Sequence, residues 1–241
     1  MKYGIFSDVH GNLPALAAVV NFLNKEQIDK LIFLGDLIGY GGSPTECIKI
    51  VKTLKPFLIA GNHEWGALSK FGLGNFNAFA RDALLWSRNQ LDRDDFAYLE
   101  TFSLSYEESN FVCVHGSLYK PQEFCYIHSS FDSETSFSLL DRQICFIGHT
   151  HRAGGFSFSN NKIEVLRTEA IRLDKDKQYI INIGSVGQPR DRDNRSSFCV
   201  YDSKRAIVKF IRLEYNIKEA ADNIIAKGLP SILANRLFEG W

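Results

Sequence analysis

The sequence lacks the long apolar run that would direct it to a membrane and the excess of positive charge that would direct it to a polyanion. No apolar segment approaches the roughly 18 consecutive residues of a membrane-spanning helix. The 28 Lys and Arg residues balance 28 Asp and Glu residues, so no overall positive field exists to gather a nucleic acid. Neither repeats nor low-complexity tracts are present. We therefore expect neither a membrane nor nucleic acid as a partner, and the sequence leaves the oligomeric state open.

Cysteine is also scarce and shows no disulfide pattern. The five cysteines are an odd number and are scattered along the chain. Cys113, Cys145 and Cys199 lie inside apolar runs, where cysteine usually acts as a small buried hydrophobe. The first residues lack the basic segment and long apolar stretch of a secretory signal. We interpret the cysteines as reduced core residues and expect a cytoplasmic protein.

What the chain does contain is ordinary globular composition, with 241 residues, 45% hydrophobic and 23% charged. This length can bury one large core, so we expect a single domain over residues 1–241. Apolar runs rich in Ile, Val, Phe and Tyr predict buried strands at 3–6, 31–34, 57–60, 111–114, 144–147, 179–183, 198–201 and 206–213.

Helical patterns fill several of the intervals between these strands. Those at 13–24 and 44–54 separate the first three strands, which predicts parallel pairing through right-handed crossovers. Helices at 78–91 and 94–102 lie within a helical insertion, 65–104, which could border the site that the strands create. Two further helices, 217–226 and 230–238, form a C-terminal extension, 214–241. The segment 117–132 is poor in strand signal and is either a substrate wall or a plain surface connection.

Residues able to bind a metal follow five of the predicted strands at once. They are Ser7-Asp8-Val9-His10-Gly11-Asn12, Gly35-Asp36, Gly61-Asn62-His63-Glu64, His115-Gly116 and Gly148-His149-Thr150-His151. In an open α/β sheet, ligands bind beyond the carboxyl ends of the strands, so we expect these groups to meet there although they are distant in sequence.

The histidines are concentrated in these motifs, which hold five of the six. Asp8 with His10, and His149 with His151, are i, i+2 pairs whose side chains share a side in an extended backbone. Taken singly, these motifs are more often turns or helix caps. Their ordered joint occurrence at strand ends favours a metal site. Its mixed carboxylate, imidazole and amide ligands without thiolate favour Mn²⁺ first, with Fe, Ni²⁺, Co²⁺ and Zn²⁺ as alternatives.

These motifs, in this order, resemble the calcineurin-like metallophosphoesterase superfamily. The segment Asn182 to Asp191 and the ending Gly228-Leu229-Pro230 to Arg236-Leu237 resemble its small single-domain bacterial and archaeal phosphodiesterase branch. The resemblance implies a four-layer α/β/β/α sandwich with two divalent metal ions at the strand ends. It implies one ion held by Asp8, His10, Asp36 and His151, and another held by Asp36, Asn62, His115 and His149.

The same resemblance assigns roles around the ions. Asp36 bridges them, and a water molecule rather than a side chain attacks the phosphorus. His63 is the candidate for protonating the leaving oxygen, with a structural role as the alternative. Asn12, Asn62 and Arg190 are candidate contacts for substrate phosphate, although Arg190 could equally form an ordinary salt bridge. His128 lies in no motif and is interpreted as structural, and Glu64 in place of Asp carries no expected difference.

One departure from the family bears on the substrate. Protein phosphatases of this superfamily carry an Asp-Arg pair where this chain has Gly39 and Tyr40, so a phosphoprotein is a poor candidate. The sequence therefore predicts a phosphodiesterase acting on a small phosphate ester. Phosphomonoesterase and dinucleoside polyphosphate hydrolase are the alternatives. An inert binding scaffold is disfavoured because every ligand position is filled, and a nuclease would need a basic groove beside the cluster.

Overall fold

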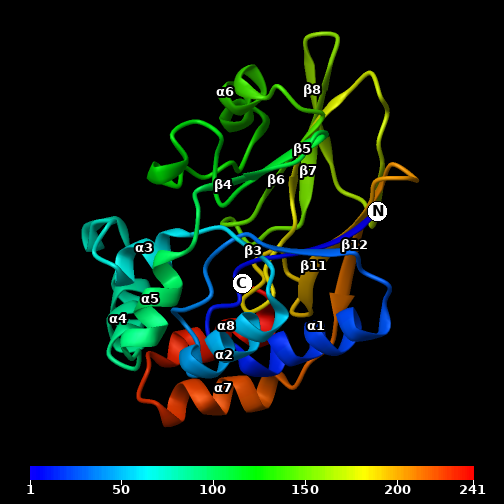
Figure 1. The fold of residues 1–241 in the computed structure, drawn as a ribbon. Helices are drawn as coiled ribbons and strands as arrows, with labels where there is room; N and C mark the ends of the chain where they lie inside the picture. Colours follow the sequence, from blue (N-terminus) through cyan, green and yellow to red (C-terminus); the bar gives the residue numbers. More distant parts are fainter.

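Two six-stranded sheets lie face to face in the computed structural model, which describes all 241 residues (Figure 1). The first sheet has the order β3 (Phe57–Leu58), β2 (Lys30–Phe33), β1 (Lys2–Phe6), β11 (Ser196–Asp202), β12 (Ile207–Leu213) and β9 (Ala170–Arg172). The second has the order β4 (Ser105–Glu107), β5 (Phe111–Val114), β6 (Ile144–Ile147), β10 (Gln178–Asn182), β7 (Gly154–Ser159) and β8 (Lys162–Leu166).

Helices cover the outer faces of both sheets (Figure 1). The first sheet is covered by α1 (Leu13–Lys25), α2 (Pro44–Leu54), α7 (Ile217–Ala226) and α8 (Ser231–Glu239). The second sheet carries α6 (Ser130–Leu139), which contacts β7, β8 and β10. At one end of the sandwich lie α3 (Asn62–Ala67), α4 (Ala78–Arg88) and α5 (Arg93–Glu100). No helix has both the length and the apolar character needed to cross a bilayer.

Alternation of side chains along the strands separates three cores. In β1, Ile5 faces the second sheet while Phe6 faces the helices; in β6, Phe146 faces the first sheet while Cys145 faces α6. Because successive strand side chains point to opposite faces, each sheet carries a hydrophobic layer on both sides. The three cores separate four layers, which confirms the predicted α/β/β/α sandwich.

The predicted parallel pairing of the first three strands is also confirmed, since β1 pairs with β2 and β2 with β3 in parallel. In the second sheet β5, β6 and β10 are parallel as well. The long return from β10 brings β11 beside β1 in the opposite direction. Each sheet therefore combines three adjacent parallel strands, whose carboxyl ends share one edge, with three strands that pair in an antiparallel manner.

Several elements were missed by the sequence pattern. They are β4, β9, the β7–β8 hairpin and α6. The hairpin turns at Asn160 and Asn161, whose φ angles of 49° and 57° suit a tight two-residue turn, so the Asn-Asn pair was a usable signal. The strands β8 and β9 are short and mostly exposed, and their pattern is correspondingly weak. The segment 117–132 contains no strand, as predicted, but α6 begins within it at Ser130.

The cysteine prediction is correct for four of the five residues. Cys47, Cys113, Cys145 and Cys199 are buried, and no disulfide is present. Cys125 is exposed, so its assignment to the core is wrong. It belongs to the loop before α6, in which Phe124 and Ile127 are buried while the Cys125 side chain points to solvent.

Truncation of the core between the sheets should cost far more stability than truncation at the surface. Phe146 is fully buried, whereas Phe131 is 78% exposed. Phe146→Ala is expected to lower the free energy of unfolding by about 3–5 kcal/mol because it leaves a cavity. Phe131→Ala is the matched control and should change it by about 0.5 kcal/mol or less. Urea unfolding followed by circular dichroism measures both, and equal losses would contradict the layer assignment.

Candidate metal centre

The five sequence motifs meet at one place, at the carboxyl ends of strands from both sheets. Asp8 and His10 follow β1, Asp36 follows β2, and Asn62 follows β3. From the second sheet, His115 follows β5, and His149 and His151 follow β6. All seven side chains are buried, with none more than 8% exposed. The tertiary structure thus brings the ligand atoms of six of the seven predicted residues together and buries the seventh, Asn62, at the end of β3.

Their metal-binding atoms form two groups that share one carboxylate. Asp8, His10, Asp36 and His151 form the first group, and Asp36, His115 and His149 form the second. In the first group His151 Nε2 lies 3.2 Å from Asp8 Oδ1, and His10 Nε2 lies 3.6 Å from Asp36 Oδ2. In the second group His115 Nε2 lies 3.2 Å from Asp36 Oδ2. Asp36 therefore stands between two potential cation sites.

Backbone carbonyl groups fix the orientation of three imidazoles. His10 Nδ1 lies 3.0 Å from the Ile38 carbonyl oxygen, and His115 Nδ1 and His151 Nδ1 each lie 2.6 Å from those of Leu34 and Gln188. Since a carbonyl only accepts, each Nδ1 carries the hydrogen and donates it. The Nε2 lone pair of each ring is thereby directed into the cluster, which is the arrangement that metal-binding histidines require.

The same orientation crowds lone pairs together. His10 Nε2 lies 3.1 Å from His151 Nε2, and because both rings carry their hydrogen on Nδ1, two lone pairs face each other there. His115 Nε2 lies 3.0 Å from His149 Nδ1, where one of the two nitrogens can donate to the other. Two oxygens, Asp8 Oδ1 and Asn62 Oδ1, are buried without a hydrogen-bond partner. An unsatisfied buried polar atom costs about 1–3 kcal/mol, and facing lone pairs repel each other. Divalent cations in the two groups would satisfy all of these atoms, so the residues fit the expected ions.

Charge within the cluster is strongly coupled. Burial alone would raise the pKa of Asp36, but the imidazoles of His115 and then His63 outweigh it and hold the pKa well below its usual range. Burial would lower the pKa of His115, but Asp36 raises it to about 9. The two therefore share a proton as an ion pair, and a cation bound between them would take the place of that proton. Burial lowers the pKa of both His10 and His149 well below the usual value, which leaves these rings neutral.

The backbone at the cluster is strained. Five of the clustered residues have φ between 48° and 65°, namely Asp8, His10, Asp36, His149 and His151. The left-handed region costs a residue other than glycine about 1–2 kcal/mol. The extended backbone predicted for the two i, i+2 pairs is therefore wrong. In the second pair the side chains also separate, because His149 joins the second group and His151 joins the first. Such strain persists where the surrounding structure imposes it, which is common at functional sites.

Glu64, to which the sequence assigned no significance, holds two of these loops in place. Its carboxylate accepts hydrogen bonds from the backbone N–H groups of Asp36 at 2.8 Å, Leu37 at 2.7 Å and Gly61 at 2.8 Å. Burial, followed by the charge of Asp36, raises the pKa of Glu64 to about 7. The usable signal was its position as the third residue of α3, where a glutamate carboxylate can accept from the backbone N–H of the residue before the helix.

His63 lies beside the first group with one free nitrogen. Its backbone N–H donates to Asp36 Oδ1 at 2.9 Å, and its ring centroid lies 4.7 Å from that of His10. His63 Nδ1 is buried and has no hydrogen-bond partner, and burial lowers the pKa of this ring to about 4. Gly39 makes room for the ring, since a Cβ on Gly39 would lie 2.2 Å from His63 Nδ1. The glycine at position 39, which departs from the Asp-Arg pair of the protein phosphatases, thus has a steric reason.

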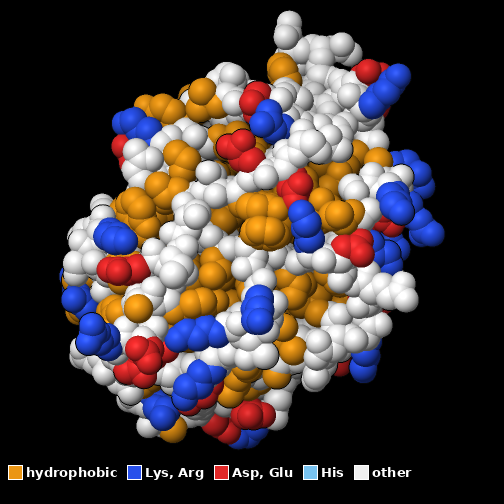
Figure 2. Space-filling view, viewed as in Figure 1, with side chains coloured by type: hydrophobic (Ala, Val, Ile, Leu, Met, Phe, Trp, Pro, Cys, Tyr) orange, Lys and Arg blue, Asp and Glu red, His pale blue; other side chains and the backbone are white.

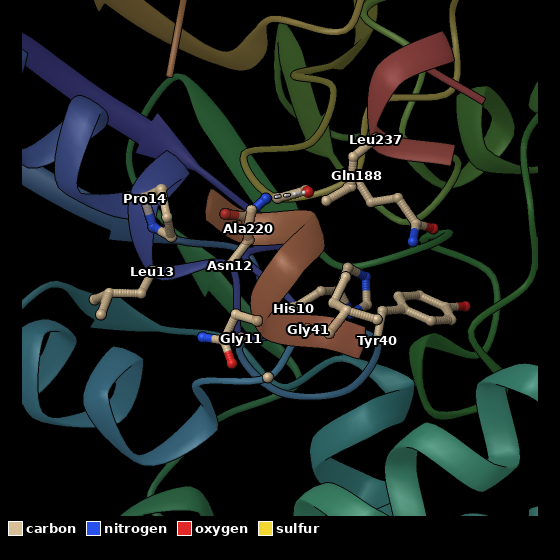
Figure 3. A pocket seen from close by; sticks show the side chains of 14 residues that line it. His10, Gly11, Asn12, Leu13, Pro14, Tyr40, Gly41, Gln188, Ala220 and Leu237 are labelled. Atoms are coloured by element: carbon tan, nitrogen blue, oxygen red, sulfur yellow. Dashed lines mark hydrogen bonds between the residues drawn. The ribbon is translucent and has the colours of Figure 1, made fainter. Parts of the chain in front are cut away.

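Asn12 and Arg190, both predicted to contact the substrate phosphate, differ in their hydrogen-bond partners. Asn12 caps α1 by accepting from the Ala15 N–H and donates to the Gly187 carbonyl at 2.8 Å, so both of its polar atoms already have partners. It also lines a cavity of about 10 Å³. The His10 and Tyr40 rings, whose centroids lie 4.4 Å apart, line the same cavity (Figure 3). Substrate contact by Asn12 stays a prediction. No acidic partner holds Arg190: its Nε and Nη2 donate to Gln188 Oε1, and its guanidinium lies 5.4 Å from the Tyr40 ring centroid.

The loop 117–132 and the segment 65–104 both border the cluster. Tyr126 stacks on His149 with a centroid distance of 3.9 Å, and His128 stacks on the other side of Tyr126 at 5.1 Å. Phe76 packs edge-on against His63 at 5.2 Å. Of the two interpretations of the loop, the geometry therefore favours a wall of the site.

Comparison with known proteins agrees with this geometry. Residues 1–153 match the model of a family described as calcineurin-like phosphoesterase. An uncharacterized protein of Methanocaldococcus jannaschii is 35% identical over 240 residues, which covers 98% of this chain and 97% of that protein.

Two solved structures have the same fold over their whole length. The structure of a metallophosphoesterase from Sphaerobacter thermophilus is 34% identical with a TM-score of 0.86, covering 100% of this chain and 99% of that chain. The structure of a hypothetical protein from Pyrococcus horikoshii has a TM-score of 0.81 at 18% identity, covering 100% and 98%. The matched family segment includes every motif from Asp8 to His151. The chain therefore belongs to the calcineurin-like phosphoesterase family.

Proposed function

We propose that this phosphoesterase is a two-metal hydrolase whose substrate is a small phosphate ester, with phosphodiesters preferred. The observation that carries the proposal is the shared carboxylate of Asp36 between two groups of buried ligand atoms. Asp8, His10, Asp36 and His151 would hold one divalent ion, and Asp36, Asn62, His115 and His149 the other. Bound there, two such ions would acidify a water molecule and polarise the phosphoryl oxygens.

The chain's own residues supply orientation and proton transfer. The carbonyls of Leu34, Ile38 and Gln188 fix three imidazoles, so the ligand geometry exists before substrate arrives. The free Nδ1 of His63 supports its assignment as the group that protonates the leaving oxygen. Because burial lowers the pKa of the free ring to about 4, this role requires that the negative charge of a bound phosphate raise the pKa. Arg190 and Asn12 are proposed to contact the phosphate.

Broader features of the proposal follow the same reasoning. We propose one domain over residues 1–241, with 65–104 as a helical insertion and 214–241 as a C-terminal extension, acting in the cytoplasm. Mn²⁺ is the first candidate ion, with Fe, Ni²⁺, Co²⁺ and Zn²⁺ as alternatives. Hydrolysis of p-nitrophenyl phosphate, its bis-ester, cyclic nucleotides and diadenosine tetraphosphate, each with Mn²⁺ and with chelator, tests the reaction class. No hydrolysis of any of them in Mn²⁺ would contradict it.

Removal of the shared carboxylate should abolish both metal binding and activity. Asp36→Asn is expected to lower kcat/KM by more than about 100-fold. Loss of a residue that only hydrogen-bonds to a metal ligand can already cost up to about 100-fold, and Asp36 is proposed to bind both ions itself. Bound metal measured by mass spectrometry should fall from two ions per chain. Asp222→Asn, which removes an exposed carboxylate paired with Lys218, is the control and should retain both ions. An Asp36→Asn protein with two ions and normal turnover would overturn the bridging role.

Metal removal should destabilise the folded chain, because only the folded state presents the clustered ligands. A ligand present at about 1,000 times its Kd stabilises the folded state by about 4 kcal/mol. Chelation should therefore lower the melting temperature by several degrees, and added Mn²⁺ should restore it. Differential scanning fluorimetry measures the shift, and Asp36→Asn should respond much less. An unchanged melting temperature on chelation of metal-loaded protein would count against the centre.

The role of His63 can be separated from metal binding by varying the leaving group. Phenyl phosphate has a poorer leaving group than p-nitrophenyl phosphate and depends more on protonation in the transition state. His63→Ala should lower kcat on phenyl phosphate by about 100-fold or more and affect p-nitrophenyl phosphate much less. Metal content should equal that of the unaltered protein. Full activity on phenyl phosphate would refute the acid role.

A further inference from the structure

A groove of about 470 Å³ opens beside the metal centre, and seven of its 19 lining residues are charged. Its walls come from the loops after β6 and β10 and from the β7–β8 hairpin. Five arginines and two aspartates line it: Arg152, Arg167, Arg190, Arg192, Arg212, Asp191 and Asp193. The volume is typical of small-molecule sites and exceeds the needs of one phosphate group.

The two aspartates are already neutralised by other arginines. Asp191 pairs with Arg212 through both oxygens, and Asp193 binds Arg195 through both of its own. No ion pair with a carboxylate is present for Arg152, Arg167, Arg190 or Arg192. Four uncompensated guanidinium groups therefore face one groove, although the whole chain has no net charge. On the face that Figure 2 draws, acidic and basic side chains are by contrast interspersed.

Three of these arginines are held in position. Arg152 Nε donates to the Arg190 carbonyl at 3.2 Å, which leaves its terminal nitrogens free. Arg190 is held by Gln188, and Arg192 stacks on the Trp241 ring at 4.1 Å. A pre-positioned guanidinium loses less entropy on binding an anion, so this arrangement is suited to recognising phosphate rather than merely attracting it.

The groove adjoins the proposed metal site through residues that neighbour its ligands in the chain. Thr150, which lines the groove, lies between His149 and His151, and Arg152 follows His151 directly. The Arg190 N–H donates to the His151 carbonyl at 3.0 Å. Arg152 and Arg190 therefore lie where the groove meets the metal ligands, and a phosphoryl group at the metal centre would have the other arginines of the groove beyond them.

We propose that this groove binds a second phosphoryl group of the substrate, and that the enzyme favours small molecules carrying two or more phosphates. The inference rests on the proposed function, because it takes the metal cluster as the place of hydrolysis. Arg152, Arg167 and Arg192 are then specificity-determining residues for the distal phosphate. The balanced charge of the chain favours a small ligand over a polynucleotide.

Competitive inhibition of p-nitrophenyl phosphate hydrolysis by orthophosphate and by pyrophosphate tests the assignment. Free Mn²⁺ is held constant, because pyrophosphate chelates it. Pyrophosphate should bind at least about tenfold more tightly than orthophosphate, as expected for added charge-assisted hydrogen bonds. The variant Arg152→Gln/Arg167→Gln should lose this advantage, while its Ki for orthophosphate reports whether the metal centre is intact.

Arg205→Gln is the matched control, because Arg205 is an exposed arginine that does not line the groove. It should keep the full preference for pyrophosphate. Equal inhibition by the two anions in the unaltered protein, or an unchanged preference in the double variant, would overturn the proposal. Tighter competition by a long single-stranded oligonucleotide than by pyrophosphate would also overturn it, in favour of a polynucleotide track.

Failure of the inference can be distinguished from failure of the proposed function. Titration calorimetry of pyrophosphate into Mn²⁺-loaded protein reads the groove without catalysis. If no ester is hydrolysed but pyrophosphate binding still depends on Arg152 and Arg167, the groove assignment stands and the hydrolase assignment fails. If esters are hydrolysed but pyrophosphate has no advantage, the hydrolase assignment stands and the groove assignment fails.

Discussion

The structure of this protein depends on the position of one carboxylate, that of Asp36, between two sets of imidazole nitrogens. Asp36 is buried, lies 3.2 Å from His115 Nε2 and 3.6 Å from His10 Nε2, and is surrounded by atoms that lack other partners. Burying a carboxylate among lone pairs is unfavourable unless positive charge is supplied. The requirement for positive charge at this point is what makes the cluster a metal site rather than a polar part of the core.

The rest of the architecture can be understood as support for that position. Glu64 holds the backbone of Asp36 and Leu37, and carbonyl groups of two loops, those after β2 and β10, hold three histidine rings. The left-handed conformation of five clustered residues is maintained by the packing of two sheets whose strand ends carry them. Stability from three hydrophobic cores thus offsets strain and electrostatic cost at one edge.

Beyond the ligands, the surroundings divide the site into two chemically different sides. Aromatic rings border the cluster on the side of the helical segment and of the loop before α6, where Phe76 packs on His63 and Tyr126 on His149. Arginines border it on the side of the groove, where Arg190 connects cluster and groove. Such an asymmetric environment orients an extended anion, because its charged end has only one favourable direction.

The sequence by itself predicted the parallel strands from strong apolar runs, and its Asp-x-His, Gly-Asp, Asn-His and His-x-His motifs predicted the four-layer fold and the ligand set through the family that they resemble. The resemblance already placed His149 and His151 at different ions, but the left-handed backbone that separates their side chains is imposed by the tertiary structure. The role of Glu64 as a brace likewise depends on its contacts with the distant Asp36 and Leu37. The sequence pattern also missed the β7–β8 hairpin and hence the groove. Only the tertiary structure decided that Arg152, Arg167 and Arg192 share one groove while Asp191 and Asp193 are neutralised, because charge compensation depends on contacts between distant segments.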